Sequence, residues 1–195
     1  GRPGERLHEL IYSSESIAIA DIREFAKENR FQIQSMIEYA NMCNDEYLLI
    51  DRDTLMRIDK IGITAEASEE IDRIIAQNIV KTIPIVQLDI WGSLPSLNVP
   101  WTEWLLYSVL NKWGDRVTVG TSSNQMKMAV PLVAPAGKYD ASEFANMTAS
   151  SSASAIRIDD LDNLDELLED IIGDEFWEEP DEFYSQFIRW RFTDK

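Results

Sequence analysis

The chain has 195 residues, of which 45% are hydrophobic and 10% aromatic, so it can bury a substantial core and is not disordered throughout. No apolar run approaches the roughly 20 residues that a membrane-spanning helix requires, so no membrane partner is expected. The formal net charge is −17, but residues 137–195 hold −11 of it, so acidity alone does not exclude nucleic-acid binding by the first 136 residues.

Residues 1–63 are predicted to form one unit of helices followed by a hairpin. Apolar residues recur at helical spacing within residues 5–12, 17–30 and 33–43. Two apolar runs then flank residues 51–54, whose aspartates are typical of a tight turn. The predicted order is helix, helix, helix, hairpin.

Residues 64–136 are predicted to form a second unit with a similar plan. Thr64 opens a helix that carries acidic residues in its early turns. Residues 82–91, TIPIVQLDIW, are rich in β-branched side chains and predict a strand.

The second half of this unit is predicted to be a helix and a hairpin. Asn98 as the cap, Pro100 as the first helical residue and Gly114 just past the end frame the helix. Two alternating runs around residues 122–125 predict the hairpin. Pro131 lies inside the second run, which predicts that this run is an edge strand.

The remaining residues are predicted to be a linker, residues 137–158, and an acidic helical extension, residues 159–195. The linker is small and polar, whereas the extension combines many carboxylates with apolar residues at helical spacing. Three hypotheses follow for the extension: it packs on its own chain, it binds a partner groove, or it competes with nucleic acid by charge. The candidate partner-binding residues are Leu164, Leu168, Ile171, Phe176 and Trp177.

The order of three helices and a hairpin resembles the winged helix-turn-helix superfamily. The likeness covers residues 5–60, and more loosely residues 66–134, and it is carried by the spacing of Ile19, Ile22, Ala26, Ile33 and Ile37. The resemblance implies an α+β fold: two small winged-helix-like units followed by an acidic helical C-terminal extension.

In that superfamily the third helix often enters the major groove of DNA and the wing contacts the backbone. The resemblance therefore implies two sets of candidate nucleic-acid-binding residues. Side chains that read or position DNA would be Arg30, Gln34, Ser35 and Asn41, and side chains on phosphates would be Arg52, Arg57 and Lys60. Against this, the third helix has no Lys or Arg and contains Glu38, although phosphate neutralisation supplies most non-specific affinity.

Catalytic chemistry has few candidates in this sequence. One cysteine, Cys43, and one histidine, His8, exclude an internal disulfide, a zinc set and most nucleophile–histidine pairs, and the lone cysteine fits a reducing cytoplasm. No glycine-rich nucleotide-binding loop is present, so no cofactor is expected. Asp51 and Asp53 could contribute to a Mg²⁺ site, but they are better explained as turn residues.

These observations predict a non-catalytic module that regulates transcription by binding duplex DNA or that takes part in an assembly. Because the chain begins at Gly1, we expect it to be part of a longer protein. One alternative is a protein-interaction module that uses the uncharged third helix and the acidic tail and binds no nucleic acid. A second alternative is a metal-dependent, nuclease-like enzyme built on Asp51 and Asp53.

Overall fold

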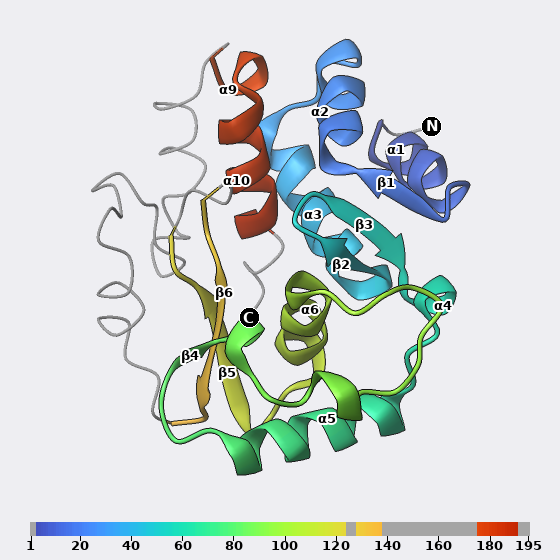
Figure 1. Cartoon of the computed structure of the whole chain (residues 1–195). Coiled ribbons are helices and arrows are strands. Elements are labelled where there is room, and N and C mark those ends of the chain that lie inside the picture. Colours follow the sequence, from blue (N-terminus) through green and yellow to red (C-terminus); the bar gives the residue numbers. More distant parts are fainter. Residues whose placement is uncertain (1–2, 124–127, 138–174, 191–195) are drawn as a thin grey trace.

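The computed structural model describes residues 3–123, 128–137 and 175–190. In these residues helices are interleaved with two antiparallel three-stranded sheets (Figure 1). The predicted α+β class is therefore confirmed.

The first unit contains the three predicted helices and the predicted hairpin. Its elements are α1 (Pro3–Tyr12), β1 (Ser16–Ala18), α2 (Ile19–Glu28), α3 (Ile33–Glu46), β2 (Tyr47–Asp51) and β3 (Thr54–Arg57). The strand order is β1-β3-β2, with both edge strands antiparallel to β3. The sequence did not predict β1, because three residues are too few to show an alternating pattern.

The second unit follows a short helix, α4 (Ile58–Ile61). Its elements are α5 (Ala65–Asn78), β4 (Ile83–Pro84), the 3-10 turns η1 (Ile85–Gln87) and η2 (Trp91–Ser93), α6 (Glu103–Trp113), β5 (Val117–Thr121) and β6 (Pro131–Pro135). The strand order is β4-β6-β5. In both sheets the last strand in sequence is therefore the central one.

The C-terminal helices α9 (Glu175–Glu178) and α10 (Pro180–Trp190) return to the first unit (Figure 1). Helix α10 contacts α2 and α3, and its Phe183, Phe187 and Ile188 are buried. This part of the predicted acidic extension packs on the chain's own helices. The predicted linker, apart from Gly137, and residues 159–174 of the extension lie outside the described residues.

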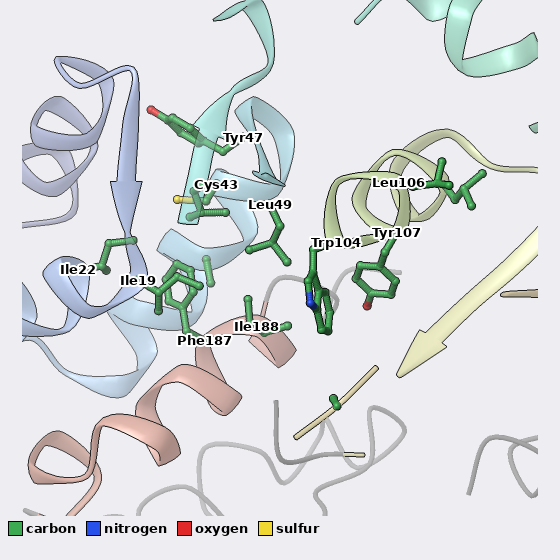
Figure 2. Close-up of a cluster of buried hydrophobic side chains, with 14 of the residues drawn as sticks. Ile19, Ile22, Cys43, Tyr47, Leu49, Trp104, Leu106, Tyr107, Phe187 and Ile188 are labelled. Carbon is green, nitrogen blue, oxygen red and sulfur yellow. The ribbon is translucent and has the colours of Figure 1, made fainter. Parts of the chain in front are cut away.

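One hydrophobic core runs through both units and α10. It joins Ile19 of α2, Leu49 of β2, Trp104 of α6 and Phe187 of α10 in a single cluster. Figure 2 shows Phe187 beside Ile19, with Ile188 on the side of Trp104. Helix α10 thus supplies apolar surface to the part of the core where the two units meet.

A second, smaller cluster lies between the first sheet and α6. Its buried members are Leu48, Ile61, Leu105 and Val109. Because Leu48 belongs to β2 and Leu105 to α6, this cluster fixes the second unit against the first sheet.

The predicted strand over residues 82–91 is wrong beyond Pro84. Residues Ile85–Gln87 and Trp91–Ser93 form 3-10 turns instead. The register pairs Pro84 with Leu132, and β6 begins one residue earlier at Pro131. Because β6 extends only one residue beyond Leu132, β4 ends at Pro84, although the β-branched residues that follow are typical of strands.

The predicted start of the helix at Asn98 and Pro100 is also wrong, because Thr102 is its N-cap. The Thr102 hydroxyl oxygen accepts a hydrogen bond from the Leu105 N–H at 3.0 Å. Asn98 instead closes the C-terminal end of α4, where its Nδ2 donates to the Lys60 carbonyl and its backbone N–H donates to the Ile61 carbonyl, both at 3.0 Å. The predicted helix end at Gly114 is confirmed.

Pro131 was expected to place its strand at an edge, but β6 is the central strand. Hydrogen bonds from Ser122 N to Val130 O and from Ala136 N to Arg116 O fix which residues of β6 face β5. By the alternation of an antiparallel ladder, Pro131 and Pro135 face the β4 side. Strand β4 pairs only with residues 132 and 133. The absence of an N–H group at Pro131 and Pro135 therefore costs no hydrogen bond to β4.

Candidate functional site

The turn between α2 and α3 carries the first predicted DNA-binding residue. Arg30 is exposed and has a φ of 53°, in the left-handed region. Its backbone N–H donates to the Lys27 carbonyl at 3.2 Å, and the Phe31 N–H donates to the Ala26 carbonyl at 2.9 Å. This turn contains no glycine, so Arg30 adopts the conformation at a cost of roughly 1 to 2 kcal/mol.

The solvent-facing side of α3 is acidic and contains no basic residue. Gln34, Glu38, Met42 and Asp45 are exposed, whereas Ser35 and Asn41 are half-buried. Of the predicted base-reading residues, Gln34 is thus the most accessible one on this helix. Because the face has two carboxylates and no cation, it would repel a phosphate backbone.

The other sides of α3 are occupied by neighbouring helices. Tyr39 donates a hydrogen bond from its hydroxyl to the Leu7 carbonyl of α1 at 3.3 Å, and burial raises the pKa of this phenol. Helix α10 packs on α3 from another direction (Figure 1). Among the described elements, none packs on the acidic side of α3 as α1 and α10 do on its other sides.

Arg57, predicted to bind phosphate, is engaged within the chain. Its Nε and Nη2 donate to the two carboxylate oxygens of Asp59 at 3.0 and 2.6 Å, and Nη1 donates to the Tyr12 carbonyl at 2.8 Å. The guanidinium also lies 4.3 Å from the centre of the Tyr12 ring. The same pair lowers the pKa of Asp59, chiefly through the hydrogen bond from Arg57.

The two other predicted phosphate-binding residues lie in different settings. Arg52 is half-buried, with its guanidinium 5.6 Å from the centre of the Trp104 ring in the second unit. Lys60 is exposed, and its Nζ lies 3.9 Å from a carboxylate oxygen of Glu15. Arg30 and Arg57 lie near opposite ends of α3, which is about 20 Å long. The predicted residues therefore do not form one basic surface.

Helix α6 has the position in the second unit that α3 has in the first, and it is enclosed. All seven residues from Trp104 to Leu110 are buried. The Ser108 hydroxyl oxygen accepts a hydrogen bond from Leu49 N at 3.2 Å, and the Thr102 hydroxyl donates to the Ile50 carbonyl at 2.6 Å. Helix α6 thus covers the open edge of β2, and it has no face available for a DNA groove.

Two of the predicted partner-binding residues lie in the described C-terminal helices. Trp177 is half-buried, with its ring centre 5.6 Å from that of Phe183. Phe176 lies within α9, while Leu164, Leu168 and Ile171 fall outside the described residues. Helix α9 is held to α2 by a 2.9 Å ion pair between Lys27 and Glu178 and by a 3.0 Å hydrogen bond from Arg23 Nη2 to the Glu178 carbonyl.

The turn between β2 and β3 has the geometry of an aspartate turn. The Asp53 N–H donates to the Asp51 carboxylate at 3.1 Å. Burial, together with the neighbouring Asp51 carboxylate, raises the pKa of Asp53. In the described residues no group of three or more His, Cys, Asp or Glu side chains could hold a metal ion.

The sequence did not identify a buried contact that fixes the start of β5 in the second unit. Asp72 is buried and accepts hydrogen bonds from the backbone N–H of Arg116 at 3.2 Å and from Arg116 Nη1 at 3.0 Å. This contact anchors the start of β5, whose outer edge is described below. Asp72 lies on the apolar side of the amphipathic helix α5. A charged residue at such a position could have indicated a buried polar contact.

Comparisons with models of known protein families, with curated proteins and with solved structures gave no match. No helix in the described part of the chain is long and apolar enough to cross a membrane. Function therefore has to be inferred from the chain's own contacts and charges.

Proposed function

We propose that the chain is a non-catalytic assembly module that binds protein and not duplex DNA, and that it is built of two winged-helix-like units. The element order of the first unit and the strand order β1-β3-β2 support the winged-helix interpretation, as does the repeated order β4-β6-β5. The second unit lacks one helix of this plan in the described residues, where η1 and η2 precede α6.

The burial of α6 carries the proposal. In helix-turn-helix proteins the recognition helix contacts base edges in the major groove, which requires an accessible face. Most side chains of α6 are buried in the core, and the hydroxyl of its N-cap Thr102 donates to Ile50 of the first sheet. Helix α6 therefore connects the two units and is not accessible to DNA.

The surface charge supports the same conclusion. The accessible side of α3 offers carboxylates, and Arg57 and Arg52 contact Asp59 and Trp104. All three predicted phosphate-binding residues thus already have a contact within the chain, although phosphate neutralisation dominates non-specific DNA affinity. The exposed side of α3 combines acidic, amide and apolar side chains, and it is better suited to a basic protein surface than to DNA.

A DNA-binding function remains the second candidate because Arg30 and Gln34 are exposed at the start of α3. Binding of the full chain to a fluorescent duplex, followed by anisotropy at low and moderate salt, separates the two. We expect no binding even at low salt. Binding that falls steeply with salt and is lost in Arg30→Glu or Gln34→Ala would overturn the proposal.

The positive test is recovery of a partner from the cells that produce the protein. We expect the tagged full chain to retain a protein partner in fixed stoichiometry after nuclease treatment. Glu38→Lys should weaken this retention, whereas the matched surface change Glu66→Lys should not. Retention that depends on intact nucleic acid would contradict the proposal.

A further inference from the structure

Strand β5 forms an edge of the second sheet, and its backbone presents hydrogen-bonding groups outward. The bonds from Ser122 N to Val130 O and from Ala136 N to Arg116 O set the phase of the β5–β6 ladder. By alternation, Thr118 and Gly120 bond β6, whereas Val117, Val119 and Thr121 direct their N–H and C=O groups away from it. No hydrogen bond between described residues reaches the outward backbone of Val119.

The equivalent edge of the first sheet is covered. Strand β2 occupies the same position in the order β1-β3-β2 as β5 does in β4-β6-β5. The outer backbone of β2 is bonded by Ser108 and Thr102 of α6. No helix covers the outer edge of β5 in this way within the described residues, although α5 and α6 pack on the sheet itself. An exposed strand edge of this kind is a template for a further strand.

The chemistry of the edge favours an extended protein segment with alternating apolar side chains. The strand VTVGT is uncharged, free of proline and rich in β-branched residues. Val119 is half-buried and packs against the core, so a neighbouring strand could extend that apolar surface on the same face.

The charges at one end of β5 specify the partner further. Arg116 is bonded to Glu69 at 2.8 Å and to Asp72 at 3.0 Å, and Asp115 is exposed beside it. Two carboxylates thus bond the guanidinium at the Val117 end and a third, that of Asp115, precedes it in sequence, while the chain as a whole carries −17. A second copy of this acidic chain would be repelled, whereas a basic segment would be attracted.

We propose that the outer edge of β5 binds an extended, basic-flanked segment of a partner protein by adding a strand to the second sheet. This inference deepens the proposed function and rests on it, because it adds a second contact surface to the acidic side of α3 and names the kind of partner segment that the assembly module takes.

The test uses the full chain and a defined probe peptide. The probe alternates threonine and valine over seven residues and carries a lysine at each end, and the matched control peptide carries glutamates instead. Amide hydrogen exchange measured by NMR reports on each outward N–H separately. We expect the lysine peptide, and not the glutamate peptide, to slow exchange of the Val119 and Thr121 amides at least about tenfold.

Two variants at one position distinguish backbone pairing from side-chain contact. Val119→Pro removes the outward N–H without removing a hydrogen bond to β6. Strand β6 itself already holds prolines, Pro131 and Pro135, at positions that face away from β5. Val119→Thr keeps both the N–H and the branched shape. We expect Val119→Thr to bind the lysine peptide and Val119→Pro to lose it, with both variants folded by circular dichroism.

Three outcomes would overturn the inference. The first is protection confined to other amides, and the second is equal binding of both peptides. The third is that the Val119 and Thr121 amides are already protected without peptide, whether in a monomer or in a dimer detected by sedimentation. The failure of the proposed function gives a different result. If Val119→Pro still retains the nuclease-resistant partner, the edge inference is wrong while the assembly function stands.

Discussion

Arg57 connects the end of β3 to the end of α1 through its hydrogen bonds and its ring contact. Two of its nitrogens bond Asp59, a third bonds the Tyr12 carbonyl, and its plane lies over the Tyr12 ring. A phosphate would have to replace these contacts, which are already charge-assisted and bidentate. The side chain thus contributes to the position of α1, and its charge is neutralised locally.

Arg30 offers a test of the strain in the turn between α2 and α3. With a φ of 53°, this residue is in a conformation that glycine adopts without a Cβ penalty. We expect Arg30→Gly to stabilise the fold by about 0.5 to 1 kcal/mol in urea denaturation. Glu28→Gly, at the exposed last residue of α2, is the control and should destabilise by a similar amount. A loss of stability in Arg30→Gly would show that its side chain matters more than its backbone.

Glu178 makes the attachment of α9 dependent on pH. The hydrogen bond from Lys27, and next its charge, lower the pKa of this carboxyl below its ordinary value. A lowered pKa means that the stabilisation is fully present above the ordinary value of about 4.5 and is lost as pH falls through the lowered one. We expect wild type to melt above Glu178→Gln at pH 7 and the two melting temperatures to converge below pH 4. A constant difference across this range would contradict the pairing.

At the scale of elements, α6 joins the two units by covering the edge of β2. A strand edge left open is liable to pair with other chains, and natural proteins often cover it with a helix. Thr102 contributes twice, because its hydroxyl caps α6 and also bonds the Ile50 carbonyl. The start of α6 and the position of the second unit therefore depend on the same side chain.

Two threonine caps allow this double role to be measured. Thr64 caps α5 by accepting from Ala67 N at 3.0 Å, whereas Thr102 caps α6 and also serves the first sheet. We expect Thr64→Ala to lower the free energy of unfolding by about 1 kcal/mol and Thr102→Ala to lower it by about 2 kcal/mol. Chemical denaturation of the two variants checks this, and equal losses would mean that the bond to Ile50 contributes nothing.

Helix α10 is predicted to be necessary for the fold, since Phe187 lies fully buried against α2 and α3. We expect Phe187→Ala to cost about 3 to 5 kcal/mol in urea denaturation, because it leaves a cavity in the shared core. Glu182→Gln, on the exposed side of the same helix, should change stability by less than about 0.5 kcal/mol. If Phe187→Ala were equally mild, α10 would be a peripheral attachment.

At the scale of the whole molecule, the continuous core implies that both units unfold together. Four of the six tryptophans, Trp91, Trp101, Trp104 and Trp113, lie in the second unit, and the fully buried Cys43 thiol reports on α3 of the first unit. We expect the urea midpoint from tryptophan fluorescence to coincide with the onset of Cys43 labelling by a thiol reagent. Cys43 reactivity at urea concentrations where fluorescence is still native would show that the units unfold separately.

Most of the long helices and both hairpins could be predicted because the forces that define them are local. Apolar spacing predicts α2 and α3, the cap at Thr64 predicts the start of α5, and Gly114 predicts the end of α6. The exposed position of Gln34 follows from the same periodicity. The unequal distribution of charge along the chain can also be read directly from the sequence.

Only the tertiary structure decides what these elements contact, because the partners are distant in sequence. Asn98 bonds Lys60, 38 residues away, and Arg23 bonds the Glu178 carbonyl across 155 residues. Pro131 is tolerated in a central strand because β4 is only two residues long. Helix α6 is buried because it packs along the outer edge of β2. Periodicity identifies which side of a helix is apolar, but long-range packing determines which surface that side meets and which edge remains open.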